Sequence, residues 1–304
     1  MTTMGASTTR IALLQHACGE DVRANVDTCV DMIRDAASRG ATLAVTQELF
    51  ASRYFCQTED DRHFALAEPI PGSTSQRMCD LAKELGIAIS ASLFERRSPG
   101  LYHNTSIMID PDGAIVDRYR KMHIPDDPRF YEKYYFTPGD LGFRVQTVGD
   151  LHTGMLVCWD QWYPEAARLT ALRGAELLLY PTAIGWYTVD VPASDAGTHG
   201  ETAETRAQQV EAWRTIQRSH AIANGVFVAA ANRIGVEDAL RFWGRSFVVD
   251  PTGQIIAEAP ADEPAVLIAD LDLSLIETQR QGWPFLRDRR IDAYHPITAR
   301  YLDE

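Results

Sequence analysis

Cys158 lies in the segment of this sequence that most favours covalent chemistry. An apolar run ends just before it, a short turn follows, and Pro164 and Glu165 then have the composition of a helix start. A thiol on a strand-to-helix turn is well placed as a nucleophile, because nearby amide N–H groups and the helix N-terminus stabilise the thiolate. Most cysteines are instead buried and inert. We interpret three others in that way: Cys18, Cys29 and Cys79.

A cysteine nucleophile needs a group that takes up its proton, since a free thiol has a pKa of about 8.5. Histidine is the usual partner, but none of the eight histidines lies in a comparably specific segment. Charged residues at the ends of apolar strands are the other candidates, because such ends gather where ligands bind in open α/β folds. Glu48 follows the apolar segment 42–46, and Lys121 follows 114–120. Taken alone, each is also typical of a solvated strand end.

Strands and helices are predicted to alternate in the first third of the chain. Apolar residues recur at helical spacing over 22–38 and 73–85, and short apolar runs at 11–15, 42–46 and 87–93 read as buried strands. This alternation indicates a layered α/β fold.

A turn with the pattern D-P-x-G-x-I occurs twice, starting at Asp110 and at Asp250. Each copy lies between two short strand-like runs, as expected for a tight turn that joins neighbouring strands. No linker separates the two regions. We therefore expect one domain whose two halves follow the same plan.

Two irregular stretches, 122–142 and 185–205, interrupt the regular pattern. Loops this long inside a compact domain are usually functional or disordered. We expect both to border a site or a subunit interface.

The composition excludes several classes of protein. Of 304 residues, 29 are Lys or Arg and 42 are Asp or Glu, for a net charge of −13, which disfavours nucleic acid and anionic membranes as partners. No stretch approaches the ~18 apolar residues of a membrane span. Five cysteines without a C-x-x-C pair argue against a disulfide framework or zinc ribbon and predict a cytoplasmic location.

Three of these residues together resemble a known active site. Glu48, Lys121 and Cys158, in that order, are similar to the Glu-Lys-Cys triad of the nitrilase superfamily of carbon–nitrogen hydrolases, and the resemblance extends from about residue 11 to 292. Longer segments resemble the N-carbamoylputrescine amidohydrolase branch. They are 121–128, 132–140, 158–166, 181–185, 231–235 and 285–290.

The resemblance implies a fold and a domain organisation. The fold is a four-layer α-β-β-α sandwich with two pseudo-symmetric halves, which fits the repeated turn. The hydrolase domain is expected over 10–292, after a disordered tail at 1–9 and before a C-terminal tail at 293–304 that lies at a subunit interface. The protein is then a homo-oligomer, a dimer or higher. Lys121 lies eight residues after Gly113, whereas Ala261 holds the equivalent place in the second half, so we expect one site per chain.

The resemblance also implies a role for each site residue. Glu48 is the general base, Cys158 the nucleophile, and Lys121 with the backbone N–H of Trp159 the oxyanion site. Glu132 matches a second glutamate that orders the lysine and the substrate. No metal or organic cofactor is expected.

The substrate that this branch implies is N-carbamoylputrescine, which yields putrescine, CO2 and ammonia in polyamine biosynthesis. Its ammonium tail calls for a carboxylate or an aromatic face. Many plant-type members have a glutamate shortly after the segment 181–185, but this chain has Gly-Trp-Tyr there and then an insertion. The candidates for binding the substrate are Tyr54, Asp160, Trp186, Asp190 and Asp195.

Other activities remain open at the level of sequence. A β-ureidopropionase or an N-carbamoyl-amino-acid amidohydrolase would need a basic residue for the substrate carboxylate, and Arg53, Arg129 or Arg206 could supply it. An ω-amidase is a further alternative. A non-catalytic scaffold of the same fold is disfavoured, because all three triad positions are occupied.

Overall fold

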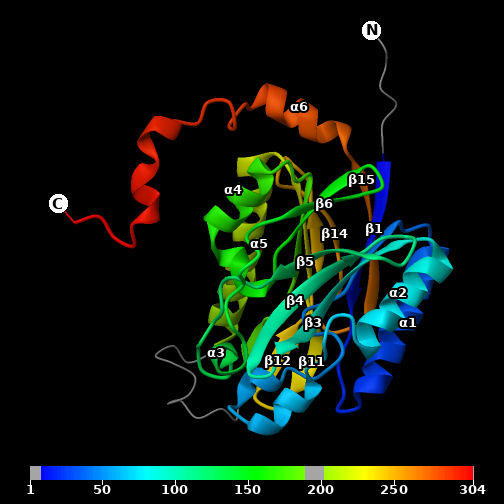
Figure 1. Cartoon of the computed structure of the whole chain (residues 1–304). Coiled ribbons are helices and arrows are strands. Elements are labelled where there is room, and N and C mark those ends of the chain that lie inside the picture. Colours follow the sequence, from blue (N-terminus) through cyan, green and yellow to red (C-terminus); the bar gives the residue numbers. More distant parts are fainter. Residues whose placement is uncertain (1–7, 189–201, 304) are drawn as a thin grey trace.

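The computed structural model describes residues 8–188 and 202–303 (Figure 1). Asp190 and Asp195, two of the residues considered for the substrate tail, lie outside these ranges. The described chain is a mixed α/β protein with two six-stranded sheets, one three-stranded sheet and flanking helices.

The first six-stranded sheet is built mainly from the first 120 residues, with the strand order β15-β1-β2-β3-β4-β5. Strands β1, β2 and β3 are parallel, while β15, β4 and β5 run antiparallel to their neighbours. The elements of this half are β1 (Thr8–Gln15), α1 (Val22–Ser38), β2 (Leu43–Val45), α2 (Ser73–Leu85), β3 (Ala88–Ser98), β4 (Leu101–Ile109), β5 (Ile115–Arg120) and β15 (Ala265–Asp272).

The second six-stranded sheet has the order β14-β13-β10-β8-β7-β6. Its parallel strands are β7, β8 and β10, and the outer strands β6, β13 and β14 run antiparallel to their neighbours. The elements of this half are β6 (Val145–Val148), β7 (Leu151–Met155), α4 (Pro164–Leu172), β8 (Leu177–Pro181), α5 (Ala203–Asn224), β10 (Phe227–Ala231), β13 (Phe247–Val249) and β14 (Ile255–Glu258).

The two halves match element by element. The succession β1-α1-β2-α2-β3-β4-β5 corresponds to β7-α4-β8-α5-β10-β13-β14, with β15 and β6 in equivalent edge positions. Both repeated turns are closed in the same way. Asp110 Oδ1 accepts hydrogen bonds from the N–H groups two and four residues later, and so does Asp250 Oδ1. Gly113 and Gly253 have φ of 84° and 86°, values that favour glycine.

The sheets pack face to face between two helical layers. Side chains of both sheets, among them Leu13, Val45, Leu179 and Phe227, belong to one buried cluster. Helices α1 and α2 cover the outer face of the first sheet, and α4 and α5 cover that of the second (Figure 1). Burial of this apolar surface provides the main driving force for folding.

Smaller elements complete the chain. The third sheet has the order β11-β12-β9, and α3 lies near it at one end of the sandwich (Figure 1). These elements are α3 (Glu132–Tyr135), β9 (Gly185–Tyr187), β11 (Ile234–Glu237), β12 (Leu240–Trp243), α6 (Ser274–Gly282) and the 3-10 turns η1 (Phe55–Gln57), η2 (Asp61–Leu66), η3 (Cys158–Trp162), η4 (Ile291–Ala293) and η5 (His295–Thr298).

The described ends of the chain differ from the expected boundaries. Strand β1 begins at Thr8, which pairs with Asp272, so its first two residues fall within the tail expected at 1–9. The region 293–304 includes η5, which is exposed. Within the described residues, no helix is both long enough and apolar enough to cross a membrane.

Candidate active site

Cys158 occupies a sharp turn between β7 and α4. The chain leaves β7 through Leu156 and Val157, both fully buried, and Cys158 then has φ = 42°. A positive φ is uncommon for a residue other than glycine and is characteristic of strained functional turns. The short turn η3 and then Pro164, at the start of α4, follow. The sequence-based prediction of a strand–turn–helix thus describes the local backbone.

Asp160 holds this turn in place. Its Oδ2 accepts hydrogen bonds from the N–H of Val157 at 2.9 Å and from the hydroxyl of Tyr119 at 2.8 Å. Its Oδ1 accepts one from the N–H of His123 at 3.1 Å and lies 2.7 Å from the ring Nδ1 of that residue. Asp160 is fully buried. Both of its oxygens are therefore engaged by the protein, which makes it a positioning residue.

Lys121 lies directly after β5, with its side chain fully buried between two glutamates. Its Nζ donates to Glu48 Oε1 at 2.8 Å and to Glu132 Oε2 at 2.6 Å. The backbone of Lys121 is fixed as well, because its N–H donates to the carbonyl of Asn104 and its carbonyl accepts from the N–H of Gly139. The ammonium is thus held by charge-assisted hydrogen bonds and is buried away from the protein surface.

The two carboxylate oxygens of Glu48 differ in their surroundings. Oε1 accepts from Lys121 and from the amide Nδ2 of Asn104, at 2.7 Å. Oε2 is buried and has no hydrogen-bond partner among the described residues. A buried polar atom that remains unpaired is costly and calls for an explanation. Of the two oxygens of Glu48, Oε2 is therefore the one that the described contacts leave unoccupied.

The charges of this cluster perturb one another. Burial raises the pKa of Cys158 well above its ordinary value, the charge of Glu48 raises it further, and Lys121 opposes both. Burial lowers the pKa of Lys121, but Glu132 and Glu48 outweigh burial and raise it well above its ordinary value. The thiol is therefore neutral at rest beside a permanently charged ammonium.

Glu132 is tied to the site from its other side. The hydroxyl of Tyr54 donates to its Oε1 at 2.7 Å, and burial raises the pKa of Tyr54, which keeps the hydroxyl protonated. Burial also raises the pKa of Glu132 to about 7, although the charge of Lys121 lowers it. Two buried carboxylates share one ammonium here, and the second is consequently harder to ionise.

A cavity of about 540 Å³ opens beside the thiol. Among the described residues, its charged lining side chains are Asp127 and Glu132, both acidic. Five aromatic side chains contribute to its wall: Phe130, Trp159, Trp162, Tyr187 and Trp243. A pocket with an apolar wall and a few polar groups at one place is the usual form of a small-molecule site.

Comparison with known proteins identifies the family of this chain. The profile of the carbon-nitrogen hydrolase family matches residues 10–281. The chain belongs to this family. Over 293 residues it is 44% identical to an N-carbamoylputrescine amidase of Solanum lycopersicum, with 93% of each chain covered.

Two further relatives are similar over nearly their whole length. A citrullinase of Francisella tularensis is 38% identical, with 96% of this chain and 99% of the relative covered. The crystal structure of a carbon-nitrogen hydrolase from Helicobacter pylori G27 superposes with a TM-score of 0.91 at 42% identity, covering 97% of this chain and 100% of that one. The protein is thus a carbon–nitrogen hydrolase.

The structure brings the main predicted residues of this hydrolase together. Glu48, Lys121 and Glu132 form one hydrogen-bonded cluster, and Cys158 couples electrostatically to all three. Trp159 lines the cavity next to the thiol.

Three other predicted substrate-binding residues are not among those that line this cavity. Asp160 is buried behind the turn, and Tyr54 lines a different cavity while its hydroxyl faces Glu132. Trp186 lies on β9 between two residues that do line the Cys158 cavity, Gly185 and Tyr187. Because successive side chains of a strand point to opposite faces, Trp186 faces away, toward a separate cavity. The side of β9 to which Trp186 points depends on the pairing of β9 with β12, and three residues of sequence do not reveal that pairing.

The arginines considered for a substrate carboxylate lie elsewhere. Arg53 and Arg129 line the same cavity as Tyr54, and Arg206 lines the cavity of Trp186. Arg53 forms ion pairs with Glu20 and Asp238. None of the three is part of the described lining of the Cys158 cavity.

Several site residues were not predicted from the sequence. Asn104 contacts Glu48 from strand β4 of the first sheet, and Asp127 and Tyr187 line the cavity from the two irregular stretches. The expectation that both stretches border a site was the signal that could have pointed to Asp127 and Tyr187. Within the described residues, no cluster of three or more His, Cys, Asp or Glu side chains is arranged to hold a metal ion.

Proposed function

We propose that this carbon–nitrogen hydrolase cleaves N-carbamoylputrescine to putrescine, CO2 and ammonia through a covalent intermediate on Cys158. The observation that carries the substrate is the cavity beside the thiol, whose charged lining residues, Asp127 and Glu132, are acidic within the described chain. The similarity to an N-carbamoylputrescine amidase supports the same choice.

The first step is attack of the Cys158 sulfur on the ureido carbonyl carbon. Because the resting thiol is neutral, its proton must leave as the carbon–sulfur bond forms, and Glu48 Oε2 is the unpaired buried acceptor that can take it. The developing oxyanion is stabilised by the Lys121 ammonium and by the backbone N–H of Trp159. Removal of one such donor typically costs about a hundredfold in rate or more.

The second step breaks the carbon–nitrogen bond. Glu48, now protonated, returns its proton to the departing nitrogen, which leaves as an amine, and the acyl group stays on sulfur. Glu48 then takes a proton from a water molecule that attacks this thioester-like carbon, and it returns that proton to the Cys158 sulfur as the carbon–sulfur bond breaks. The carbamic acid released from the sulfur loses CO2 and frees the remaining nitrogen product, so that ammonia and putrescine have both been formed. No redox change occurs in this sequence.

The shape and charge of the cavity suit an apolar chain with a cationic end. The four methylene groups of the substrate fit against aromatic side chains such as Phe130 and Trp159, and burial of methylene groups is favourable. The carboxylate of Asp127 is exposed and forms no ion pair with any described residue, so it can receive the ammonium. Glu132 orders Lys121 at the reacting end.

Substrates that end in a carboxylate fit this lining less well. N-carbamoyl-β-alanine and other N-carbamoyl amino acids would place a negative charge near Asp127, with no lysine or arginine on the described wall to compensate. Citrulline ends in both an ammonium and a carboxylate, so Asp127 could receive the first, but the second would have no basic partner on the described wall. An ω-amide that ends in a carboxylate meets the same difficulty. The family match and the complete triad leave no basis for a non-catalytic scaffold.

The experiment that tests the substrate compares a charged and a neutral tail. N-butylurea has the ureido group and the four carbons of N-carbamoylputrescine but lacks the ammonium. We expect Asp127→Asn to lower kcat/KM for N-carbamoylputrescine about tenfold or more, because a charge-assisted contact is lost, and to leave kcat/KM for N-butylurea unchanged. Equal effects on both compounds would contradict the role of Asp127.

A substrate panel tests the activity itself. Ammonia release is measured with N-carbamoylputrescine, N-carbamoyl-β-alanine, an N-carbamoyl-D-amino acid, citrulline and an ω-amide at equal concentrations. The proposal predicts the highest kcat/KM for N-carbamoylputrescine. A higher value for citrulline or any other carboxylated compound would overturn it.

We also propose that the hydrolase is a homo-oligomer built from dimers. After α6 the chain leaves the sandwich and passes outside α4 (Figure 1). This segment exposes large apolar side chains to an unusual degree: Ile291 by 69%, Ile297 by 66%, Tyr301 by 81% and Leu302 by 62%. Clustered exposed apolar residues mark interaction sites.

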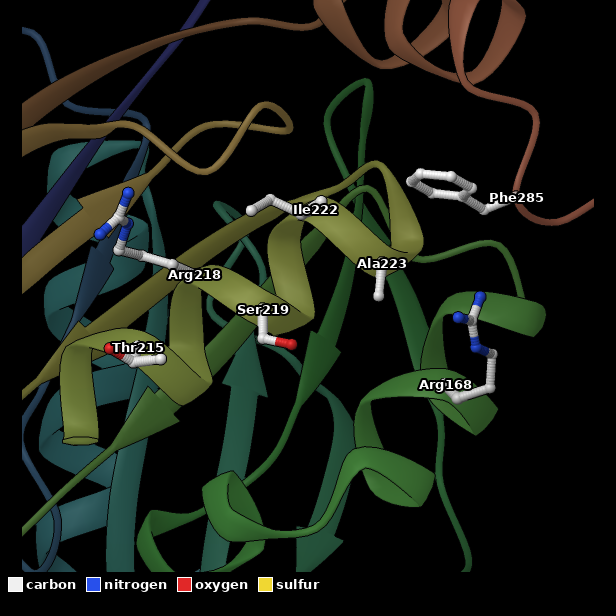
Figure 2. Close-up of a pocket in the computed structure, with 7 residues that line it drawn as sticks. All are labelled: Arg168, Thr215, Arg218, Ser219, Ile222, Ala223 and Phe285. Atoms are coloured by element: carbon white, nitrogen blue, oxygen red, sulfur yellow. The ribbon is translucent and has the colours of Figure 1, made fainter.

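A cavity of about 560 Å³ separates the beginning of this segment from the helical face (Figure 2). Phe285 overhangs it, and α4 and α5 contribute Arg168 and Ile222. Leu169 and Leu172 of α4 are also exposed. A second copy of the chain is the occupant that would cover both surfaces.

All five cysteines are buried and unpaired, which supports the reducing cytoplasm as the location of this protein.

A further inference from the structure

Arg233 is a fully buried arginine that the proposed reaction does not use. It lies between β10 and β11 in the second half of the chain, with an exposed fraction of 0%. Its Nη2 donates to two carbonyls of the turn that carries the general base, Glu48 at 2.8 Å and Leu49 at 3.1 Å. Both terminal nitrogens also reach the carbonyl of Ser52 at 3.3 Å. One side chain of the second half therefore binds the backbone on which Glu48 is mounted.

The backbone at this point needs such support. Leu49, directly after Glu48, has φ = 49°, in the left-handed region that leucine rarely adopts. A conformation of this kind persists only when surrounding contacts enforce it. The guanidinium supplies two of these contacts from one side, and Ser92 Oγ supplies a third by accepting from the N–H of Leu49 at 3.1 Å. The orientation of Glu48 thus depends on a strained turn and the groups that hold it.

Glu237 on β11 pairs with this arginine and extends its reach. Its Oε1 lies 2.9 Å from Nη1 of Arg233, and Glu237 is 1% exposed. The Oε2 of Glu237 accepts a hydrogen bond from the N–H of Tyr54 at 2.5 Å. Tyr54 in turn donates its hydroxyl to Glu132. The ion pair therefore connects by short, buried contacts to both glutamates that flank Lys121.

We propose that the Arg233–Glu237 pair is a positioning device that sets Glu48 and Glu132 on either side of Lys121. A buried ion pair is by itself weak evidence for stability, because desolvation offsets much of its attraction. The value of this pair lies in its geometry: a planar guanidinium can donate in several fixed directions at once. The inference rests on the proposed role of Glu48 as the base.

The test separates position from stability. In Arg233→Lys, the ammonium still neutralises Glu237 but cannot span Glu237 and two carbonyls together. In Arg233→Met combined with Glu237→Gln, the buried charges are removed together, so neither is left unpaired. For both variants we expect kcat to fall roughly tenfold to a hundredfold, the usual cost of a misplaced catalytic group, with KM changed less than about threefold. Thermal melting is measured in parallel.

A second readout does not depend on the substrate. The rate at which iodoacetamide alkylates Cys158 reports how well Glu48 is placed to take the thiol proton, and we expect it to slow in both variants. Asp250→Ala is the control, since it loses three hydrogen bonds of the β13–β14 turn, away from the site. It should lower the melting temperature and leave kcat and alkylation unchanged.

Each outcome decides whether the Arg233–Glu237 pair positions the site or only stabilises the fold. Unchanged kcat and alkylation in a folded variant would overturn the proposal. Failure of both variants to fold would show that the pair is structural and would overturn it too. If the wild-type protein did not cleave N-carbamoylputrescine, the proposed substrate would fail, whereas the alkylation rates would still test the positioning role.

Discussion

At the scale of single residues, the site depends on which oxygen of Glu48 is free. Lys121 and Asn104 both bind Oε1, and the buried Oε2 is left without a partner. Hydrogen bonds from protein donors hold the carboxylate in one orientation, and in the proposed mechanism its second oxygen takes the proton of Cys158. The first prediction follows from this difference between the two oxygens of Glu48.

The substitution Glu48→Gln retains an acceptor for Lys121 and Asn104 but replaces the free oxygen with an amide nitrogen. We expect kcat to fall by about 10²–10⁴-fold, the range associated with loss of a general base, with the melting temperature nearly unchanged. Ammonia release and calorimetry measure the two effects. Because loss of a general base costs at least about a hundredfold, retention of more than about a tenth of the wild-type kcat would show that another group is the base.

The carboxyl of Glu132 gives a prediction for the pH dependence of stability. Burial raises its pKa to about 7 from an ordinary value of 4.5, so the folded state binds this proton more tightly than the unfolded state. The proton on Glu132 contributes fully to stability below the pKa that this carboxyl has in the unfolded state. This contribution is lost as the pH rises through the pKa that it has in the folded state. Glu132→Gln removes this loss.

We therefore expect the wild-type melting temperature to decline relative to that of Glu132→Gln between pH 4.5 and about 7. The difference should level off above that window. Carboxylates with lowered pKa values titrate at lower pH and are common to both proteins, so they cancel in the comparison. Parallel curves across the window would contradict the raised pKa of Glu132.

The individual residues also show what can be read from a sequence. Cys158 could be singled out because its turn has local signals, whereas the choice of Glu48 and Lys121 needed the family resemblance. Trp186 was a reasonable aromatic candidate by position, but the face of a three-residue strand depends on its pairing with β12. Arg233 acts 185 residues away from Glu48, and no local pattern reveals such a contact.

At the scale of elements, the turn that carries Cys158 is held by the buried carboxylate of Asp160. Asp160 joins the end of β7 to β5 through Tyr119 and to the following loop through His123. These contacts fix the positive φ of Cys158. The turn and the residues after β5 therefore form one structural unit, although they are far apart in the sequence.

Asp160→Asn keeps the size of the side chain but replaces one acceptor oxygen with a donor that faces the N–H of Val157 or of His123. We expect the free energy of unfolding to fall by about 1–3 kcal/mol, the cost of leaving a buried donor unpaired, and kcat to fall with it. Urea denaturation measures the first effect. Asp110→Asn, in the half-exposed turn of the first half, is the control and should cost less; an equal loss in both would contradict the special role of Asp160.

Local signals explain which elements were predicted well. Helices α1 and α2 begin and end where the apolar spacing and the glycine after α2 indicate, over Val22–Ser38 and Ser73–Leu85. Strands β9, β11 and β12 were not predicted, because segments of three or four residues have too few positions for a period. They form the third sheet, which places Tyr187 and Glu237. The mixed α/β class follows from alternation, while the packing of the sheets is a long-range property.

At the scale of the whole molecule, the segment after α6 is the feature that the contacts within one chain do not bury. Its apolar side chains are exposed, and the homo-oligomer proposed above would bury them. Ile297→Asp combined with Tyr301→Asp places two charges in that interface, and burial of unpaired charge is strongly unfavourable. We expect the variant to shift to a smaller assembly, measured by light scattering.

Two results would contradict the proposed interface. If the wild-type chain is a monomer at all accessible concentrations, or if the double variant has the mass of the wild type, the segment is not the interface. Ile256→Asp on β14 is a matched control, because this residue is also apolar and exposed but lies on another part of the surface. It should leave the mass unchanged.

The most direct test of the account is ammonia release from N-carbamoylputrescine by the purified protein and by its Cys158→Ala variant. The variant should have the melting temperature of the wild type, since only a sulfur at the cavity wall is lost. The account predicts rapid release by the wild type and none above the uncatalysed rate by the variant. Release by Cys158→Ala at a rate near that of the wild type would contradict the covalent mechanism, and a wild type inactive on this compound would contradict the substrate.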